Sequence, residues 1–196
     1  MADLLTSEAP DLIVALPMGN EYNAVAMVPV GPPFEFFSSV EAATPTPGVW
    51  QVSYAMMRAQ ITALAKRNAL LVLAAIEEVA NCPVLALPPP PPVRDEGHIR
   101  AHPGRFAKAV AQSGLNPPDL RARLWQLYAD VLADALATTQ TVFVTLPDAV
   151  FELHDGQRYL APTMRSDDPT HANAIYGAAI FQAIVEQWPV SQASAA

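Results

Sequence analysis

The chain has 196 residues, of which 52% are hydrophobic and 15% are charged. This size and composition suffice for one globular domain with a sizeable core, and they exclude an intrinsically disordered protein. The formal net charge of -8 at pH 7 argues against a general nucleic-acid binder, because binding to phosphates requires clustered Lys and Arg.

The cysteine content and the length of the apolar runs bear on the cellular location of the protein. The single cysteine, Cys82, excludes a disulfide within the chain and gives no support to secretion. The first residues lack the basic region and the long apolar core of a signal peptide, and the longest apolar run, residues 69–76, is too short to span a bilayer. We therefore expect a cytoplasmic protein without membrane contact.

Three apolar runs have the pattern of strands buried on both faces of a parallel sheet. They are residues 12–16, 84–87 and 141–146, and each is closed by Leu-Pro. After the first run, Gly19, Asn20 and Asn23 predict a turn. After the second, five prolines at 88–92 favour a rigid segment that leaves the sheet, although alone they would also suit a polyproline ligand.

Long connections and a helical region separate these runs. Residues 28–47, rich in Pro and Phe, predict a long loop, and residues 49–81 have helical spacing with a break near 67–68. Residues 94–115 predict a second connection with a short helix around 106–112. The inward positions expected in the helical region include Met56, Ile61, Leu64 and Leu71.

The next helix has clear start signals. Asn116 is predicted to be its N-cap, with Pro117 at the first helical position and Asp119 in the first turn. Residues 154–156 predict a turn, and residues 172–188 predict the last helix. An apolar stripe is expected along the helix that Asn116 opens, at Leu120, Leu124, Leu127 and Val131.

This order of strands and helices predicts an α/β fold in which a mainly parallel sheet lies between two layers of helices. We find no internal repeat and expect a single domain over residues 1–196. In open sheets of this kind, ligands bind at the carboxyl ends of the strands, which is where the candidate polar residues follow.

Asp168 and His171 are the strongest candidates for chemistry. A His that acts as a general base needs a partner that fixes its tautomer and stabilises the imidazolium, and an Asp three residues away can do both. The alternative interpretation is that Asp168 caps the last helix and His171 is an ordinary first-turn residue. A second candidate is Asn20, which lies directly behind the first strand.

Other groups of polar residues give weaker indications of a functional site than Asp168 and His171 do. His98 and His102 have metal-ligand spacing for a helix, but neighbouring glycines and a proline argue against a helix there, so no metal is expected. No Gly-rich phosphate loop occurs, and no cofactor is expected. The basic residues within 94–123 form a cluster that would steer an anionic substrate or serve as a solvated face.

The sequence DPTH at residues 168–171 resembles the last block of the SGNH (GDSL-like) hydrolase superfamily, which comprises esterases and lipases with a flavodoxin-like sheet and a Ser-His-Asp triad. The sequence GNE at 19–21 is similar to the G-x-N-[DE] block of that family, whose Asn donates to the oxyanion hole. The resemblance covers about residues 10–188. It implies that Asp168, His171 and Asn20 are catalytic.

The chain departs from the family pattern in two ways. Met18 stands where the family has a Gly two residues before its Asn, and no Gly-Asp-Ser occurs, so the block that carries the nucleophile is missing. The block with a second oxyanion donor cannot be placed either. The candidate substitutes, none of them on a strand-to-helix elbow, are Ser38, Ser39, Ser53 and Ser166.

The missing block has a structural consequence. By the family alignment, residues 12–16 correspond to the third strand of five, and the N-terminal strands are absent. The first strand of the family lies beside the third, so residues 12–16 would form an exposed apolar edge. We expect either a homodimer through this strand or a first part of the protein that is encoded upstream.

The resemblance implies an ester hydrolase that acts on a small-molecule carboxylic ester or an acetylated sugar by serine acyl transfer, with the nucleophile not evident in the chain. His171 would deprotonate the serine, Asp168 would orient His171, and Asn20 would help to hold the oxyanion. The alternatives are a non-catalytic SGNH-like binding or scaffold protein that has lost the nucleophile, and an interaction protein that presents its proline run as a ligand.

Overall fold

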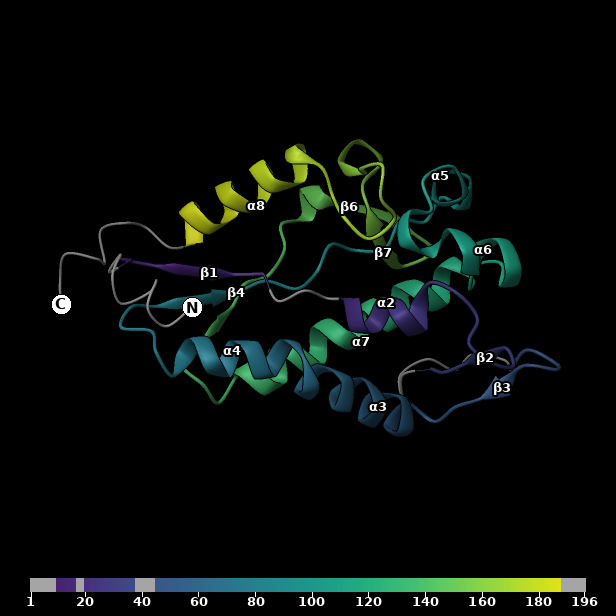
Figure 1. Ribbon diagram of the computed structural model, residues 1–196, viewed down its shortest axis with the longest axis horizontal. Coiled ribbons are helices and arrows are strands. Elements are labelled where there is room, and N and C mark those ends of the chain that lie inside the picture. Colours follow the sequence, from purple (N-terminus) through teal and green to yellow (C-terminus); the bar gives the residue numbers. More distant parts are fainter. Residues whose placement is uncertain (1–9, 17–19, 38–44, 188–196) are drawn as a thin grey trace.

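The computed structural model describes residues 10–16, 20–37 and 45–187, and the side chains of Asn20 and Gln187 lie outside that description. Within these ranges the chain has a mixed α/β fold with one three-stranded parallel sheet, two small two-stranded sheets, and helices packed around them (Figure 1). The α/β class predicted from the sequence is confirmed.

The main sheet contains β1 (Ile13–Ala15), β4 (Val84–Ala86) and β5 (Val142–Phe143), in the order β1-β4-β5 and all parallel. The three apolar runs form these strands as predicted, but each strand is shorter than its run. A hydrogen bond from Val144 N to Ala86 O (2.8 Å) extends the pairing beyond β5. The pairing then ends near the prolines, which have no N–H to donate.

Two helices follow the long loop, α3 (Tyr54–Arg67) and α4 (Ala69–Glu77), and they meet at Asn68 with a bend of 46°. The break predicted at 67–68 is therefore confirmed. In the described ranges no single helix is long and apolar enough to cross a membrane, and only the bent pair of α3 and α4 taken together meets that test of length and composition.

The rotation of α3 and α4 differs in part from the prediction. Ile61 is buried and Leu64 is half-buried as expected, but Met56 and Leu71 are exposed, so those two inward assignments are wrong. The packing of α3 against α7 and of α4 against β1 and β4 selects a different stripe. The residues on that stripe are Met57, Ile61, Ala65, Ala69, Leu73 and Ile76.

Helix α7 (Pro118–Leu136) packs beside α3, and Figure 1 shows α4 and α7 on one side of the main sheet and α8 (Ala174–Gln187) on the other. All four predicted stripe residues of α7 are buried, which confirms that face. Asn116 is not the N-cap. Its side chain instead donates to the carbonyls of two residues near the end of α2 (Asn20–Ala26), because it is buried against that helix.

Short elements occupy regions predicted as loops or turns. β2 (Phe34–Glu35) pairs in parallel with β3 (Trp50–Gln51), so the predicted loop at 28–47 contains a strand and the helical region begins only at Tyr54. The Glu35 carboxylate, which accepts a hydrogen bond from Thr46 N (2.6 Å) and another from Gln51, holds this pair together. The predicted turn that includes Asn23 is instead helix α2.

The connection at 94–115 contains more structure than predicted. α6 (Ala107–Ser113) matches the short helix expected there, but α5 (Glu96–Ala101) was judged unlikely and is present. It forms because the Asp95 side chain caps it by accepting from His98 N at 3.1 Å. A short 3-10 turn, η1 (Gly104–Phe106), joins the two helices.

The turn predicted at 154–156 is confirmed, and it closes a hairpin that was not predicted. β6 (Phe151–His154) pairs antiparallel with β7 (Gln157–Leu160). Asp155 and Gly156 have φ values of 48° and 75°, as a two-residue hairpin turn of this hand requires.

Candidate functional site

Asp168 and His171 are in direct contact, with Nδ1 of His171 2.8 Å from Oδ1 of Asp168. They lie in a turn that precedes α8 and is closed by a single β-bridge between Arg165 and Ala172. Asp168 does not cap the helix: the side chain of Asn173 accepts from Ile175 N (2.9 Å) and does so instead. The interpretation of Asp168 as a helix cap is therefore excluded.

Two hydroxyl groups hold this turn. Ser166 Oγ donates to the carbonyl of His171 (2.9 Å), which ties the two ends of the turn together. Thr170 binds Asp168 Oδ1 twice, through its backbone N (2.8 Å) and through Oγ1 (2.7 Å). Nε2 of His98, on α5, lies 2.9 Å from the carbonyl of Ser166 and fixes the turn against that helix. None of these roles was predicted from the sequence.

The hydrogen bonds also set the charge of the pair. Partial burial of Asp168 opposes its ionisation, but the hydrogen bonds from Thr170 and His171 outweigh burial and hold the pKa of the carboxyl below its usual range. Because an ionised carboxylate can only accept, Nδ1 of His171 carries the proton. Nε2 has no partner among the described residues, and 67% of the His171 side chain is exposed. Nε2 is therefore available to accept a proton.

Gly104 in η1 packs directly on the carboxylate. A Cβ at this position would lie 2.7 Å from Oδ2 of Asp168, which is closer than real contacts allow, and the φ of Gly104 is +50°. A residue without a side chain is thus needed both for the backbone conformation and for the space. Segments some 60 residues apart in the chain are brought together here, near α5.

The structure does not place the side chain of Asn20, which lies outside the described residues; its backbone opens α2. The neighbouring Glu21 has a structural role. Its Oε1 accepts from Ala69 N (3.1 Å) and its Oε2 accepts from the hydroxyl of Tyr128 (3.2 Å). Figure 1 shows α2 and α5 beyond the carboxyl ends of the strands, the side where ligands bind in open sheets.

Ser53 and Ser166, two of the candidate nucleophiles, have structural roles. Ser53 caps α3 by accepting from Met56 N (3.2 Å), and Ser166 is engaged in the turn. Neither hydroxyl is hydrogen-bonded to a ring nitrogen of His171. Ser38 and Ser39 lie outside the described residues.

Several basic residues of the cluster within 94–123 pair with carboxylates. Arg94 pairs with Glu152 at 2.9 Å, Arg123 pairs with Asp119 at 2.8 Å, and Arg100 lies 3.6 Å from Glu96. Arg121 is fully buried, donates to the carbonyl of Arg94 (3.1 Å), and leaves two of its nitrogens without partners; burial lowers its pKa. Three of the six Lys and Arg residues in 94–123 thus have a carboxylate partner and a fourth is buried, which reduces the charge that could steer an anionic ligand.

His98 and His102 do lie on and at the end of a helix, contrary to the argument from glycine and proline, and their ring centroids are 4.8 Å apart. Oδ1 of Asp167 lies 3.5 Å from Nδ1 of His102. Within the described ranges no three His, Cys, Asp or Glu residues form a group that could hold a metal ion.

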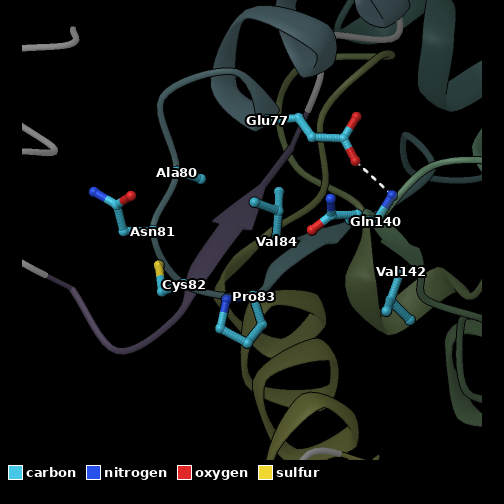
Figure 2. A pocket seen from close by; sticks show the side chains of 8 residues that line it. All are labelled: Glu77, Ala80, Asn81, Cys82, Pro83, Val84, Gln140 and Val142. Carbon is cyan, nitrogen blue, oxygen red and sulfur yellow. Dashed lines mark hydrogen bonds between the residues drawn. The ribbon is translucent and has the colours of Figure 1, made fainter. Parts of the chain in front are cut away.

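A cavity of about 480 Å³ lies at the opposite end of the main sheet, where β4 and β5 begin (Figure 2). Glu77 borders it and accepts from the backbone N of Gln140, as the dashed line shows. Cys82 also lines it, and burial, with a smaller contribution from Asp11, raises the pKa of its thiol. Neither Asp168 nor His171 lines this cavity, so its size alone does not make it the reactive site.

Comparisons of the chain with protein-family models, with curated proteins and with solved structures find no match. The protein is therefore classified by its own fold and by the residues of its candidate site. It is a mixed α/β protein that carries an exposed Asp-His pair in a tightly hydrogen-bonded turn.

Proposed function

We propose that the protein is an ester hydrolase of the SGNH kind, in which Asp168 and His171 supply the acid-base half of a serine acyl-transfer site. The observation that carries the proposal is the 2.8 Å contact of His171 Nδ1 with an ionised Asp168, on a His171 side chain that is 67% exposed and whose Nε2 has no partner among the described residues. A general base positioned in this way contributes roughly 10²- to 10⁴-fold to a reaction rate.

We propose the SGNH type for the fold as well. A three-layer, flavodoxin-like sheet of the SGNH type is supported by the parallel order β1-β4-β5 and by helices on both sides of the sheet in Figure 1. In that arrangement β1 corresponds to the third strand of the family.

In the proposed reaction, His171 Nε2 takes the proton of a serine hydroxyl as the oxygen attacks the ester carbonyl, and then returns the proton to the leaving alcohol. Asp168 stabilises the imidazolium that forms between these steps. Asn20 donates to the developing oxyanion, a role worth roughly 3–4 kcal/mol where it operates. The substrate class is a small carboxylic ester or an acetylated sugar, and the serine is neither Ser53 nor Ser166.

A non-catalytic SGNH-like binding or scaffold protein is the second candidate. It is favoured by the structural engagement of Ser53 and Ser166, because neither of these hydroxyls is placed for His171 to activate. Hydrolysis of an aryl acetate that depends on His171 tests the first candidate against the second. Labelling by a serine-directed fluorophosphonate, located by mass spectrometry, identifies the nucleophile.

We further propose that a second copy of the chain pairs with the open edge of β1. Ile13 and Ala15 lie on the face of β1 that α4 covers, whereas Val14 is 37% exposed and Leu16 63% exposed. No described strand pairs with the outer edge of β1, and no charge lies between residues 12 and 16. A twofold axis near Val14 would join two sheets without bringing like charges together.

The lone thiol gives no support to secretion, so a cytoplasmic location stays part of the proposal.

A further inference from the structure

We infer that Thr170 is a positioning residue for the Asp168-His171 pair, and that its hydroxyl sets both the orientation of the carboxylate and the tautomer of the imidazole. The catalytic consequence of this role rests on the proposed function, whereas the positioning itself does not. The Thr170 hydroxyl contacts Asp168 Oδ1 and Nδ1 of His171 and not the reacting Nε2, so it acts through its two neighbours.

Three donors surround one oxygen of the Asp168 carboxylate. Oδ1 of Asp168 accepts from Thr170 N (2.8 Å), from Thr170 Oγ1 (2.7 Å) and from His171 Nδ1 (2.8 Å). The other oxygen, Oδ2, packs against Gly104. Rotation of the carboxylate would break two bonds to Thr170 at once, so the oxygen that faces His171 is fixed.

The Thr170 hydroxyl lies between the Asp168 carboxylate and the His171 ring. Its hydrogen is used by Asp168, and its oxygen lies 3.3 Å from Nδ1 of His171. Two acceptors, Asp168 Oδ1 and Thr170 Oγ1, therefore face the same ring nitrogen. This arrangement favours the tautomer with the proton on Nδ1 and keeps Nε2 free of a proton.

The turn does not depend on this hydroxyl for its shape. The bridge between Arg165 and Ala172 and the Ser166 bond to the carbonyl of His171 close it independently. The backbone N of Thr170 keeps its bond to Asp168 whatever side chain stands at this position. A substitution that removes only the hydroxyl should therefore leave the turn folded.

The test compares Thr170→Val, which keeps the shape and loses the hydroxyl, with Thr170→Ser, which keeps the hydroxyl. Thr139→Val is the matched control, because Thr139 Oγ1 bonds a carbonyl at the end of α7, away from the turn. Two NMR readouts are followed: the ¹³C shift of the Asp168 carboxyl through an acid titration, and the ¹⁵N shifts of the His171 ring near neutral pH.

In Thr170→Val we expect the pKa of Asp168 to move up toward its ordinary value, because a hydrogen bond to the ionised form is lost, and the Nδ1-H tautomer to lose population. Thr170→Ser and Thr139→Val should match the wild type in both readouts. Unchanged Asp168 titration and unchanged ¹⁵N shifts in Thr170→Val would overturn the inference.

Ester hydrolysis separates this inference from the proposed function. If the NMR readouts change as expected and the wild type hydrolyses no ester, the positioning role stands and the hydrolase proposal fails. If the wild type is active and Thr170→Val lowers kcat rather than raising KM, with Thr170→Ser restoring it, both stand. If Thr170→Val keeps full activity and wild-type NMR shifts, the positioning role fails and the hydrolase proposal stands.

Discussion

Asp168 is held by more contacts than a surface carboxylate needs. It receives hydrogen bonds from Thr170 and His171 and packs against Gly104, although a third of its side chain, 34%, is exposed. Such concentration of donors on one group is typical of sites where orientation matters, although ordinary turns also use Asp-Thr contacts. The exposed Nε2 of His171 is what distinguishes this turn from a purely structural one.

The lowered pKa of Asp168 predicts a pH-dependent contribution to stability. Because the folded-state pKa lies below the unfolded one, the contribution is complete above the ordinary value of 3.8 and is lost as the pH falls through the folded pKa. Solvent screening limits it to under about 1 kcal/mol. In urea unfolding, the difference in free energy between the wild type and Asp168→Asn should shrink between about pH 5 and pH 2. A difference that stays constant with pH would contradict this assignment.

At the scale of elements, Glu21 links three helices. It lies in the first turn of α2, accepts from the backbone N that opens α4, and accepts from a tyrosine of α7. Ala69 N has no helical acceptor at the start of α4, so Glu21 satisfies a donor that the helix geometry leaves open. The residue next to the candidate oxyanion donor thus anchors the helix on which that donor lies.

Glu21→Ala should destabilise the protein by roughly 1–3 kcal/mol, because Ala69 N and the Tyr128 hydroxyl both lose an acceptor. Glu21→Gln retains one acceptor oxygen and should lose less. Urea unfolding at neutral pH measures both. A loss of less than about 0.5 kcal/mol in Glu21→Ala would show that water replaces the carboxylate without cost.

Local signals in the sequence predicted some elements well and others poorly. The stripe of α7 and the break between α3 and α4 were predictable, because amphipathic spacing is a property of the segment itself. The rotation of α4 was not, because nearly all its residues are apolar and only contact with the sheet selects a face. α5 was not predicted, because Gly97 disfavours a helix and the capping role of Asp95 was not recognised.

The candidate site could likewise be predicted from the sequence only in part. The Asp168-His171 contact follows from a spacing of three residues and was predictable. The role of Gly104 was not, because it depends on a segment some 60 residues away. The Thr170 contacts are local, and an Asp two residues before a Thr is a turn signal that could have indicated them.

At the scale of the whole molecule, the main sheet has an open edge at β1 within the described residues. We expect Val14→Lys to convert a dimer into a monomer, because it places a charge at the centre of the proposed strand pair. Light scattering after size-exclusion chromatography measures the mass. Val30→Lys, at an exposed valine outside the sheet, is the control and should leave the dimer intact. A wild type that is monomeric at all concentrations would refute the pairing.

The most direct test of the account is the hydrolysis of an aryl acetate by the purified protein and by His171→Gln. His154→Gln is the matched control, because His154 also lies beside an aspartate, at 3.3 Å from Asp155, but on the β6-β7 hairpin turn. We predict that the wild type and His154→Gln hydrolyse the ester at equal rates and that His171→Gln loses about 100-fold or more in kcat/KM. Equal rates for His171→Gln and the wild type, or no hydrolysis by either, would contradict the assignment of Asp168 and His171 as a catalytic pair.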